Sequence, residues 1–249
     1  MSRRHPPTEH HTPEPAPSAT AVATGQTEQH LCAPPAAEAL GAPVHRDLVE
    51  PFGALRRAAA AGGFDLRILS GFRSFDRQLV IWNEKATGRR AVLDTDAVPL
   101  DITTLSEREL VFAILRWSAL PGASRHHWGS DVDVYDHTAQ PPGYEIELIP
   151  EEVNPGGMFA PLHAWLDERI AAGTACGFFR PYDRDRGGVA PERWHLSHAP
   201  TAARYERLLT PARLRATIGQ ADMRLKDAVL EHLDEIVERF VVNTNRAAS

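Results

Sequence analysis

Two short stretches of the sequence carry side chains that bind divalent metal ions. Residues 124–133, Ser-Arg-His-His-Trp-Gly-Ser-Asp-Val-Asp, place His126 and Asp133 seven positions apart around a glycine. About sixty residues later, a Glu-Arg-Trp-His block supplies His195, three positions after Glu192. Zinc takes nitrogen and oxygen ligands in a tetrahedron, and a catalytic site leaves one position open for water. Two histidines and one aspartate therefore form a candidate catalytic zinc set.

The carboxylate of Glu192 is a candidate for proton transfer at such a site. Water bound to zinc has its pKa lowered from about 16 to roughly 7, and a nearby carboxylate can take its proton and pass it to a leaving amine. Residues three apart on an extended strand point to opposite faces. The sequence therefore requires a bend or turn between Glu192 and His195 if both are to reach one metal.

These blocks resemble the signature of the zinc D-alanyl-D-alanine carboxypeptidases and dipeptidases of cell-wall metabolism and vancomycin resistance. The wider group includes lysostaphin-type peptidases and hedgehog domains. The family signature combines Ser-x-His, x-x-Gly-x-x-x-Asp and Glu-x-Trp-His with an upstream Ser-Gly-Tyr-Arg-Ser-x-x-x-Gln. Here the upstream block, residues 70–78, reads Ser-Gly-Phe-Arg-Ser-Phe-Asp-Arg-Gln, with Phe72 in place of Tyr. The blocks occur in the family's order, and the resemblance spans about residues 64–198.

The resemblance implies a role for each matching residue. The three implied zinc ligands are His126, Asp133 and His195. Glu192 would be the general base and acid, and Arg73 would stabilise the oxyanion or hold the substrate. Gln78 and Ser124 would contact the terminal carboxylate of the substrate or its last peptide unit. A fixed guanidinium at Arg73 also suits the negative charge of a tetrahedral intermediate.

Two positions depart from the family pattern. The residue three after the last ligand histidine, often Tyr in the family, is His198 here, which could orient that ligand or merely fill the space of the Tyr. The common Gly-x-Ala-x-Asp appears as Gly-Ser-Asp-Val-Asp, so Asp131 is a rival ligand, although the spacing from His126 favours Asp133. We expect His127 near the site but not on the metal.

Hydrophobic periodicity and turn signals outline the elements that must position these residues. We expect helices over about 47–61, 74–85, 106–120 and 159–171, and a strand over 64–69 that places Arg73 just past its end. Ser74 is a candidate N-cap, and Ser106 with Glu109 forms a capping box. Asp133 is expected on a strand, and the alternating residues 144–149 are expected to pair with that strand as an antiparallel hairpin.

The predicted fold class is α+β, with a small, mostly antiparallel sheet that carries the zinc site and helices around it. Periodicity supports the mixture of elements, and the family resemblance implies the sheet arrangement. Residues 1–30, rich in Pro, Thr, Ala and His, are expected to be a disordered leader. Residues 31–249 are expected to form the carboxypeptidase domain. This domain includes a C-terminal amphipathic helix of about seventeen residues, for which packing on its own domain is favoured over a dimer contact.

Composition limits the partners and the compartment. The net charge of −6 offers no basic footprint for nucleic acid or an anionic membrane. The sequence contains no run of eighteen apolar residues, so we predict no transmembrane segment. Near its start there is no apolar run of the length that a secretory signal needs. As written, the chain is expected to be cytoplasmic, or periplasmic or extracellular if its start is misassigned. The sequence does not indicate an oligomeric state.

The predicted function is zinc-dependent removal of the terminal D-alanine from peptidoglycan stem peptides, a D,D-carboxypeptidase activity. An L,D-carboxypeptidase acting on tetrapeptides in wall recycling remains open, because the motif residues are shared. A non-catalytic zinc domain that binds a wall peptide or a protein partner is the alternative from another class. The presence of both Glu192 and Arg73 argues against that alternative.

Overall fold

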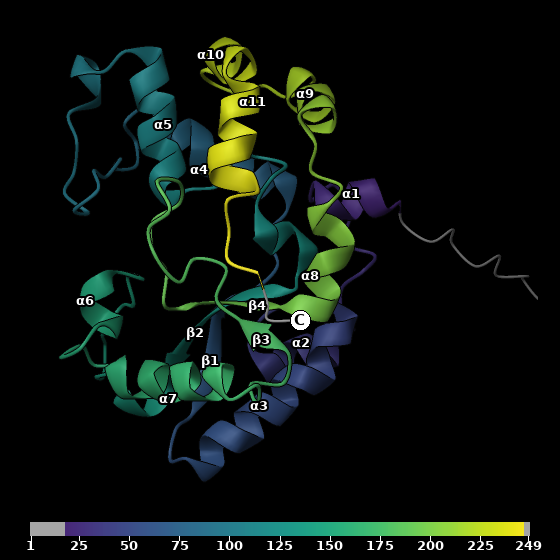
Figure 1. Cartoon of the computed structure of the whole chain (residues 1–249), viewed down its shortest axis with the longest axis vertical. Helices are drawn as coiled ribbons and strands as arrows, with labels where there is room; N and C mark the ends of the chain where they lie inside the picture. Colours follow the sequence, from purple (N-terminus) through teal and green to yellow (C-terminus); the bar gives the residue numbers. More distant parts are fainter. Residues whose placement is uncertain (1–17, 247–249) are drawn as a thin grey trace, which may run out of the picture.

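The computed structural model describes residues 18–246 and contains a four-stranded antiparallel sheet. The strand order is β1-β2-β4-β3. The strands are β1 (Leu66–Ser70), β2 (Asp131–Asp136), β3 (Phe178–Phe179) and β4 (His195–His198). Helices surround this small sheet, so the predicted α+β class is confirmed (Figure 1).

One face of the sheet is covered by two helices, α3 (Val49–Ala61) and α7 (Ala160–Ala171), which Figure 1 shows below the strands. Phe52 and Leu55 of α3 and Leu162 of α7 are fully buried there. They pack in one hydrophobic cluster with Val132 and Leu196, which alternate with site residues along β2 and β4. Because this cluster holds one face of β2 and β4, the site residues that alternate with Val132 and Leu196 point to the opposite face.

A second hydrophobic cluster is built mainly from helices on the other side of the sheet (Figure 1). These helices are α4 (Phe75–Ala86), α5 (Glu107–Trp117), α8 (Ala199–Glu206), α9 (Pro211–Gly219), α10 (Lys226–Glu231) and α11 (Leu233–Ile236). Ser74 caps α4 through its side chain, and Ser106 and Glu109 form the predicted capping box of α5. Both predicted helix starts are thus confirmed.

The C-terminal amphipathic stretch forms two short helices and a π-helical turn, whereas the sequence predicts one continuous helix. α10 ends before His232, and α11 continues into a π-helical turn, η5 (Val237–Val241). The apolar side chains of Val229, Leu233 and Phe240 are still buried in the helical cluster. The stretch therefore packs on its own domain, as expected.

The predicted hairpin partner of β2 is wrong. The neighbours of β2 are β1 and β4, and residues 144–149 form an irregular loop. The buried carboxylate of Glu152 explains the difference, because it accepts hydrogen bonds from the backbone N–H groups of Glu147 and Leu148, each at 2.9 Å. Leu148 also has a φ of 58°, which interrupts an extended backbone.

The expected boundary of the leader near residue 30 is too late. Residues 1–17 lie outside the described part of the chain, but helix α1 (Ala19–Ala23) packs against α8. Val22 and Ala23 are buried, and the indole N–H of Trp128 donates to the carbonyl of Ala23 at 3.1 Å. Two small apolar residues and the Ser18 cap are enough to dock this segment, although it lacks a longer hydrophobic period.

The remaining elements are short. They are the helices α2 (Pro34–Leu40) and α6 (Pro150–Val153) and the 3-10 turns η1 (Arg46–Leu48), η2 (Ile102–Thr104), η3 (Arg125–Trp128) and η4 (His137–Ala139). Among residues 18–246, no helix combines the length and the hydrophobicity needed to cross a bilayer.

Candidate metal centre and active site

The three predicted ligands meet at one point of the fold. His126 lies in the η3 turn, Asp133 in the middle of β2, and His195 at the start of β4, directly opposite Asp133 in the antiparallel register. One nitrogen or oxygen from each residue lies within 4.8 Å of the others, and all three residues are buried. The β2–β4 pairing therefore joins two motif blocks that are about sixty residues apart in the sequence.

Hydrogen bonds fix which nitrogen of each histidine faces the centre. The Nδ1–H of His126 donates to the carbonyl of Gly71 at 2.9 Å, because a carbonyl can only accept, and this leaves Nε2 bare at 3.3 Å from Oδ2 of Asp133. His195 uses the opposite nitrogens. Its Nε2–H donates to Oδ1 of Asp131 at 3.0 Å, and its Nδ1 lies 3.3 Å from Oδ1 of Asp133.

This donor set fits a divalent cation. Oδ1 of Asp133 and Nδ1 of His195 are both buried without a hydrogen-bond partner in the described part of the chain. Burial favours the neutral form of Asp133, but the imidazoles that face it outweigh burial and hold its pKa well below the usual range. One carboxylate and two bare imidazole nitrogens are ligands that zinc accepts. His126, Asp133 and His195 are therefore the residues that could hold the metal.

Asp131, the rival ligand, is engaged on the far side of His195. Its carboxylate is fully buried and accepts from Nε of Arg125 at 2.7 Å and from Oγ of Ser130 at 2.7 Å, besides the histidine. Arg125 in turn donates to Glu206 and to Ser197. A carboxylate behind a metal-binding histidine fixes the ring and raises its basicity. The arrangement thus favours Asp133 as the metal ligand and Asp131 as the residue that orients His195.

Glu192 lies beside the ligand group, on the turn that the sequence requires. The backbone N–H of His195 donates to the carbonyl of Glu192 at 3.2 Å, so the chain bends and both side chains face the same point. Oε2 of Glu192 is 3.5 Å from Nδ1 of His195. Burial raises the pKa of Glu192 to about 7. A carboxylate with this pKa suits a general base and acid near neutral pH.

Arg73 follows β1 and enters the site with its guanidinium held by neutral partners. It donates to Oε1 of Gln78 at 3.0 Å and to Oγ of Ser70 at 3.4 Å. Gln78 is fully buried, and its Nε2 donates to the carbonyl of Ala119 at 2.7 Å. Both ends of this amide are therefore occupied. Gln78 positions Arg73 in this structure, which differs from the substrate contact that we expected.

Two other histidines lie near the centre without facing it. The Nδ1–H of His127 donates to the carbonyl of Arg73 at 2.6 Å, and its Nε2 accepts from the N–H of Gly122, as befits a residue expected near the metal but not on it. His198 shares a 2.9 Å hydrogen bond with Thr201. His195 is oriented by Asp131 instead, so His198 does not support the ligand directly.

A cavity of about 330 Å³ opens over the candidate centre. The expected site residues that line it are Arg73, Ser124, His126, Asp133, Glu192 and His195. Sequence reasoning missed three basic residues on its walls, Lys85, Arg90 and Arg125. Arg125 occupies the variable position of the Ser-x-His block, and Lys85 lies seven residues, about two helical turns, after Gln78. That helical spacing is the signal that could have placed Lys85 on the site face.

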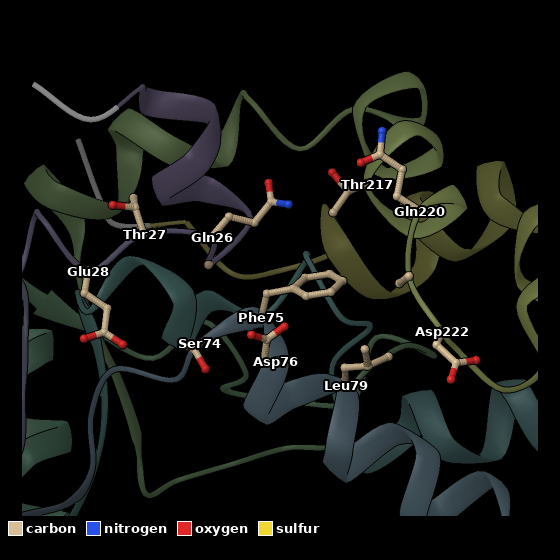
Figure 2. Close-up of a pocket in the computed structure, with 12 residues that line it drawn as sticks. Gln26, Thr27, Glu28, Ser74, Phe75, Asp76, Leu79, Thr217, Gln220 and Asp222 are labelled. Atoms are coloured by element: carbon tan, nitrogen blue, oxygen red, sulfur yellow. The ribbon is translucent and has the colours of Figure 1, made fainter. Parts of the chain in front are cut away.

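A larger cavity, about 580 Å³, lies elsewhere, between the N-terminal segment, the start of α4 and α9. Figure 2 shows Gln26 and Thr27 on one side of it, Thr217 and Gln220 on the other, and Phe75 between them. None of the candidate metal ligands lines this cavity. The smaller cavity is therefore the candidate active site.

Comparisons with known proteins agree with the motif blocks. The sequence model of a family described as D-alanyl-D-alanine carboxypeptidase matches residues 42–201. Two uncharacterised proteins of Haemophilus influenzae are similar to this chain. One is 40% identical over 97 residues, which are 39% of this chain and 66% of the relative. The other is 30% identical over 124 residues, which are 49% and 93% of the two chains.

Several solved structures are similar at lower identity. A mutant of the vancomycin resistance D,D-pentapeptidase VanY in complex with Zn(II) is 21% identical, with a TM-score of 0.43 over 75% of this chain and 84% of that one. VanYB in complex with D-alanine-D-alanine is 21% identical, with a TM-score of 0.44 over 72% and 84%. The LdcB LD-carboxypeptidase is 21% identical, with a TM-score of 0.43 over 75% and 68%.

Proposed function

The chain belongs to the D-alanyl-D-alanine carboxypeptidase family, and from this premise we propose that it is a zinc-dependent D,D-carboxypeptidase that removes the terminal D-alanine from peptidoglycan stem peptides. One observation carries the proposal. The bare nitrogens of His126 and His195 converge on Asp133, and Glu192 lies at hydrogen-bonding reach of the same point with a pKa raised by burial to about 7. Together these four residues supply metal ligands and a proton carrier.

The proposed mechanism assigns a task to each residue of the cavity. A divalent cation held by His126, Asp133 and His195 would supply Lewis acidity toward the scissile carbonyl and toward water. Glu192 takes a proton from the attacking water and delivers it to the nitrogen of the departing D-alanine. Arg73 presents a fixed guanidinium to the negative charge that develops on the carbonyl oxygen.

Ser124 is proposed to bind the terminal carboxylate of the substrate. Ser124 lines the cavity and lies two positions before His126 in the sequence, which supports this role. A hydroxyl can donate to a carboxylate oxygen. Gln78 is left out of this contact, because its amide is committed to Arg73 and Ala119.

Similar proteins include both a D,D-pentapeptidase and an LD-carboxypeptidase, so an L,D activity on tetrapeptides is the second candidate. The family description favours the D,D bond. A non-catalytic domain that only binds a wall peptide is disfavoured, because such a domain has no need for Glu192 and Arg73 beside the ligands. The proposed partner is therefore a stem peptide or muropeptide that is turned over.

The test is D-alanine release by the purified, zinc-loaded protein from two muropeptides in parallel. One is a pentapeptide ending in D-Ala-D-Ala, and the other is a tetrapeptide ending in a single D-Ala. We expect release from the pentapeptide and a loss of roughly 10²- to 10⁴-fold in the Glu192→Ala variant, with zinc retained. Release from the tetrapeptide would establish the L,D alternative. Release from neither above the Glu192→Ala background would overturn the carboxypeptidase proposal.

A further inference from the structure

Four cationic side chains line the cavity over the candidate centre, and they differ in how they are neutralised. They are Arg73, Lys85, Arg90 and Arg125. Arg125 is paired with Asp131 at 2.7 Å and with Glu206 at 2.6 Å, and Arg90 is paired with Glu84 at 3.2 Å. The ammonium of Lys85 has no ion-pair or hydrogen-bond partner anywhere in residues 18–246. Lys85 is thus the cation on this wall that lacks any polar partner.

Lys85 is also buried, with 8% of its surface exposed. Burial and, to a smaller extent, the positive charge of Arg90 lower its pKa to about 8 against the opposing charge of Glu192, so the side chain is still mostly protonated at neutral pH. Its Nζ is not one of the fully buried polar atoms in residues 18–246, so the ammonium keeps access to open space while its stem is buried, as long lysine side chains do. The cavity that Lys85 lines is where a partner would arrive.

The amino-acid usage of the chain makes this position stand out. Of the 27 basic residues, only Lys85 and Lys226 are lysines, and the other 25 are arginines. Nζ of Lys226 donates to the carbonyl of Ala221 at 2.7 Å, in a part of the fold that does not line the site. A lysine offers a compact point charge that can turn toward an anion, whereas an arginine offers a flat fork.

We propose that Lys85 determines substrate specificity by binding a carboxylate of the peptide substrate. The inference rests on the proposed function, because it assumes that a peptide occupies the cavity above Asp133 and Glu192. Two carboxylates of a stem peptide have the required chemistry. One is the terminal carboxylate of the departing residue, and the other is the free carboxylate on the side chain of a diamino acid near the scissile bond.

The experiment measures both binding and turnover with three matched pentapeptides. The first carries both carboxylates, the second has lysine in place of the carboxylated diamino acid, and the third ends in a carboxamide. Binding is measured by calorimetry with the zinc-loaded Glu192→Gln protein, which prevents turnover, with and without Lys85→Met. Lys226→Met is the matched control, and Lys85→Arg tests whether charge alone suffices. Melting temperature and zinc content are recorded for every variant.

We expect Lys85→Met to weaken binding of the first peptide by about 30-fold or more, as for truncation of one partner of a buried charge pair. One of the other peptides should already bind weakly and lose little more, and its missing carboxylate identifies the group that Lys85 binds. Lys226→Met should bind all three peptides like the parent protein.

Three results would overturn the inference. Lys85→Met could weaken all three peptides equally, which is the signature of a lysine that only fills space, or it could weaken none of them. Alternatively, none of the peptides could bind. If instead binding depends on Lys85 but the wild-type protein releases no D-alanine, the inference stands and the proposed function fails.

Discussion

The sheet wall of the cavity, formed by β2, β4 and the η3 turn, differs from the helix wall, formed by α4 and the segment that leads into it from Arg73, in how its polar groups are held. On the sheet wall, His126 is bonded to Gly71 and His195 to Asp131, which is itself held by Arg125. On the helix wall, Arg73 has neutral partners and Lys85 has none in the described part of the chain.

This difference separates two kinds of preorganisation. Buried carboxylates and carbonyls on the sheet wall fix the histidine rings before any metal binds, so the donor atoms need little rearrangement. The positive charges of the helix wall are positioned but not neutralised, so they remain available to a negatively charged peptide. Substitutions on the sheet wall should therefore affect metal binding, and substitutions on the helix wall should affect the substrate.

The largest effect is expected on the sheet wall, from Asp133→Asn. This change keeps the shape of the side chain but removes the negative charge that faces both imidazoles. Zinc content after dialysis should fall from one equivalent to near zero, and D-alanine release should fall to background. Metal analysis and the pentapeptide assay measure the two results.

Asp131→Asn is the matched variant for this prediction, two residues away on the same strand. It removes the negative charge behind His195 and leaves the three ligand atoms in place. Zinc affinity should fall about 10- to 100-fold, and activity should return at saturating zinc. If Asp131→Asn loses the metal and Asp133→Asn keeps it, the assignment of ligand and support is reversed.

A smaller effect is expected on the helix wall, from Gln78→Leu. The variant removes the carbonyl that accepts from Arg73, so the guanidinium is no longer fixed. We expect kcat/KM to fall about 10²-fold, as for a small misplacement of a positioning group, while zinc content is unchanged. Stopped assays of D-alanine release together with metal analysis separate the two quantities.

Asn83→Leu provides the control on the same helix. The amide of Asn83 also bonds at both ends, to Asp222 and Arg224, but it does not line the cavity. Gln78→Leu should lose about 1–3 kcal/mol of stability for the unpaired buried groups, and Asn83→Leu should lose less, because the hydrogen bonds of Asn83 are exposed to solvent. Only Gln78→Leu should lose activity in the folded protein. Equal activity losses in both variants would show that Gln78 acts through stability alone.

The sequence predicted the sheet wall better than the helix wall, and the reason is physical. Asp133 and His195 lie in short blocks whose residue types and spacing suit metal ligands. The role of Lys85 depends on a buried position, and a lysine near the end of an amphipathic helix normally indicates a solvent-facing side. Its burial comes from tertiary packing around the cavity, which includes Leu93 and Trp117 from later segments.

Two failures on the wider fold have the same origin. Alternation over 144–149 favours a strand, but the carboxylate of Glu152 takes the backbone N–H groups that a strand would need. The polar composition around residues 18–30 favours disorder, but Trp128 and Phe75 bond to carbonyls of that segment. In both cases a partner distant in sequence decides the conformation, and no local pattern contains it.

The smallest expected effect is the change of kcat/KM with pH for the carboxylate-bearing pentapeptide. This pH dependence involves one residue from each wall. On the acid side, Glu192 must be deprotonated to accept a proton. Burial and the negative charge of Asp133 raise its pKa to about 7 against the opposing charges of Arg73 and Lys85. The active form is therefore lost as pH falls through this value. A bound cation lowers the pKa, so the acid limb lies at or below pH 7.

On the basic side, Lys85 must stay protonated to bind the carboxylate. Burial and Arg90 lower its pKa to about 8, and the negative charge of Glu192 opposes them, so the positive charge is lost as pH rises through about 8. We expect kcat/KM to fall by up to about tenfold per pH unit on each limb. Lys85→Arg keeps its charge at high pH, so it should keep the acid limb and lose the basic one. A basic limb that persists in Lys85→Arg would mean that another group controls it, and the charge on the helix wall would then not govern substrate binding.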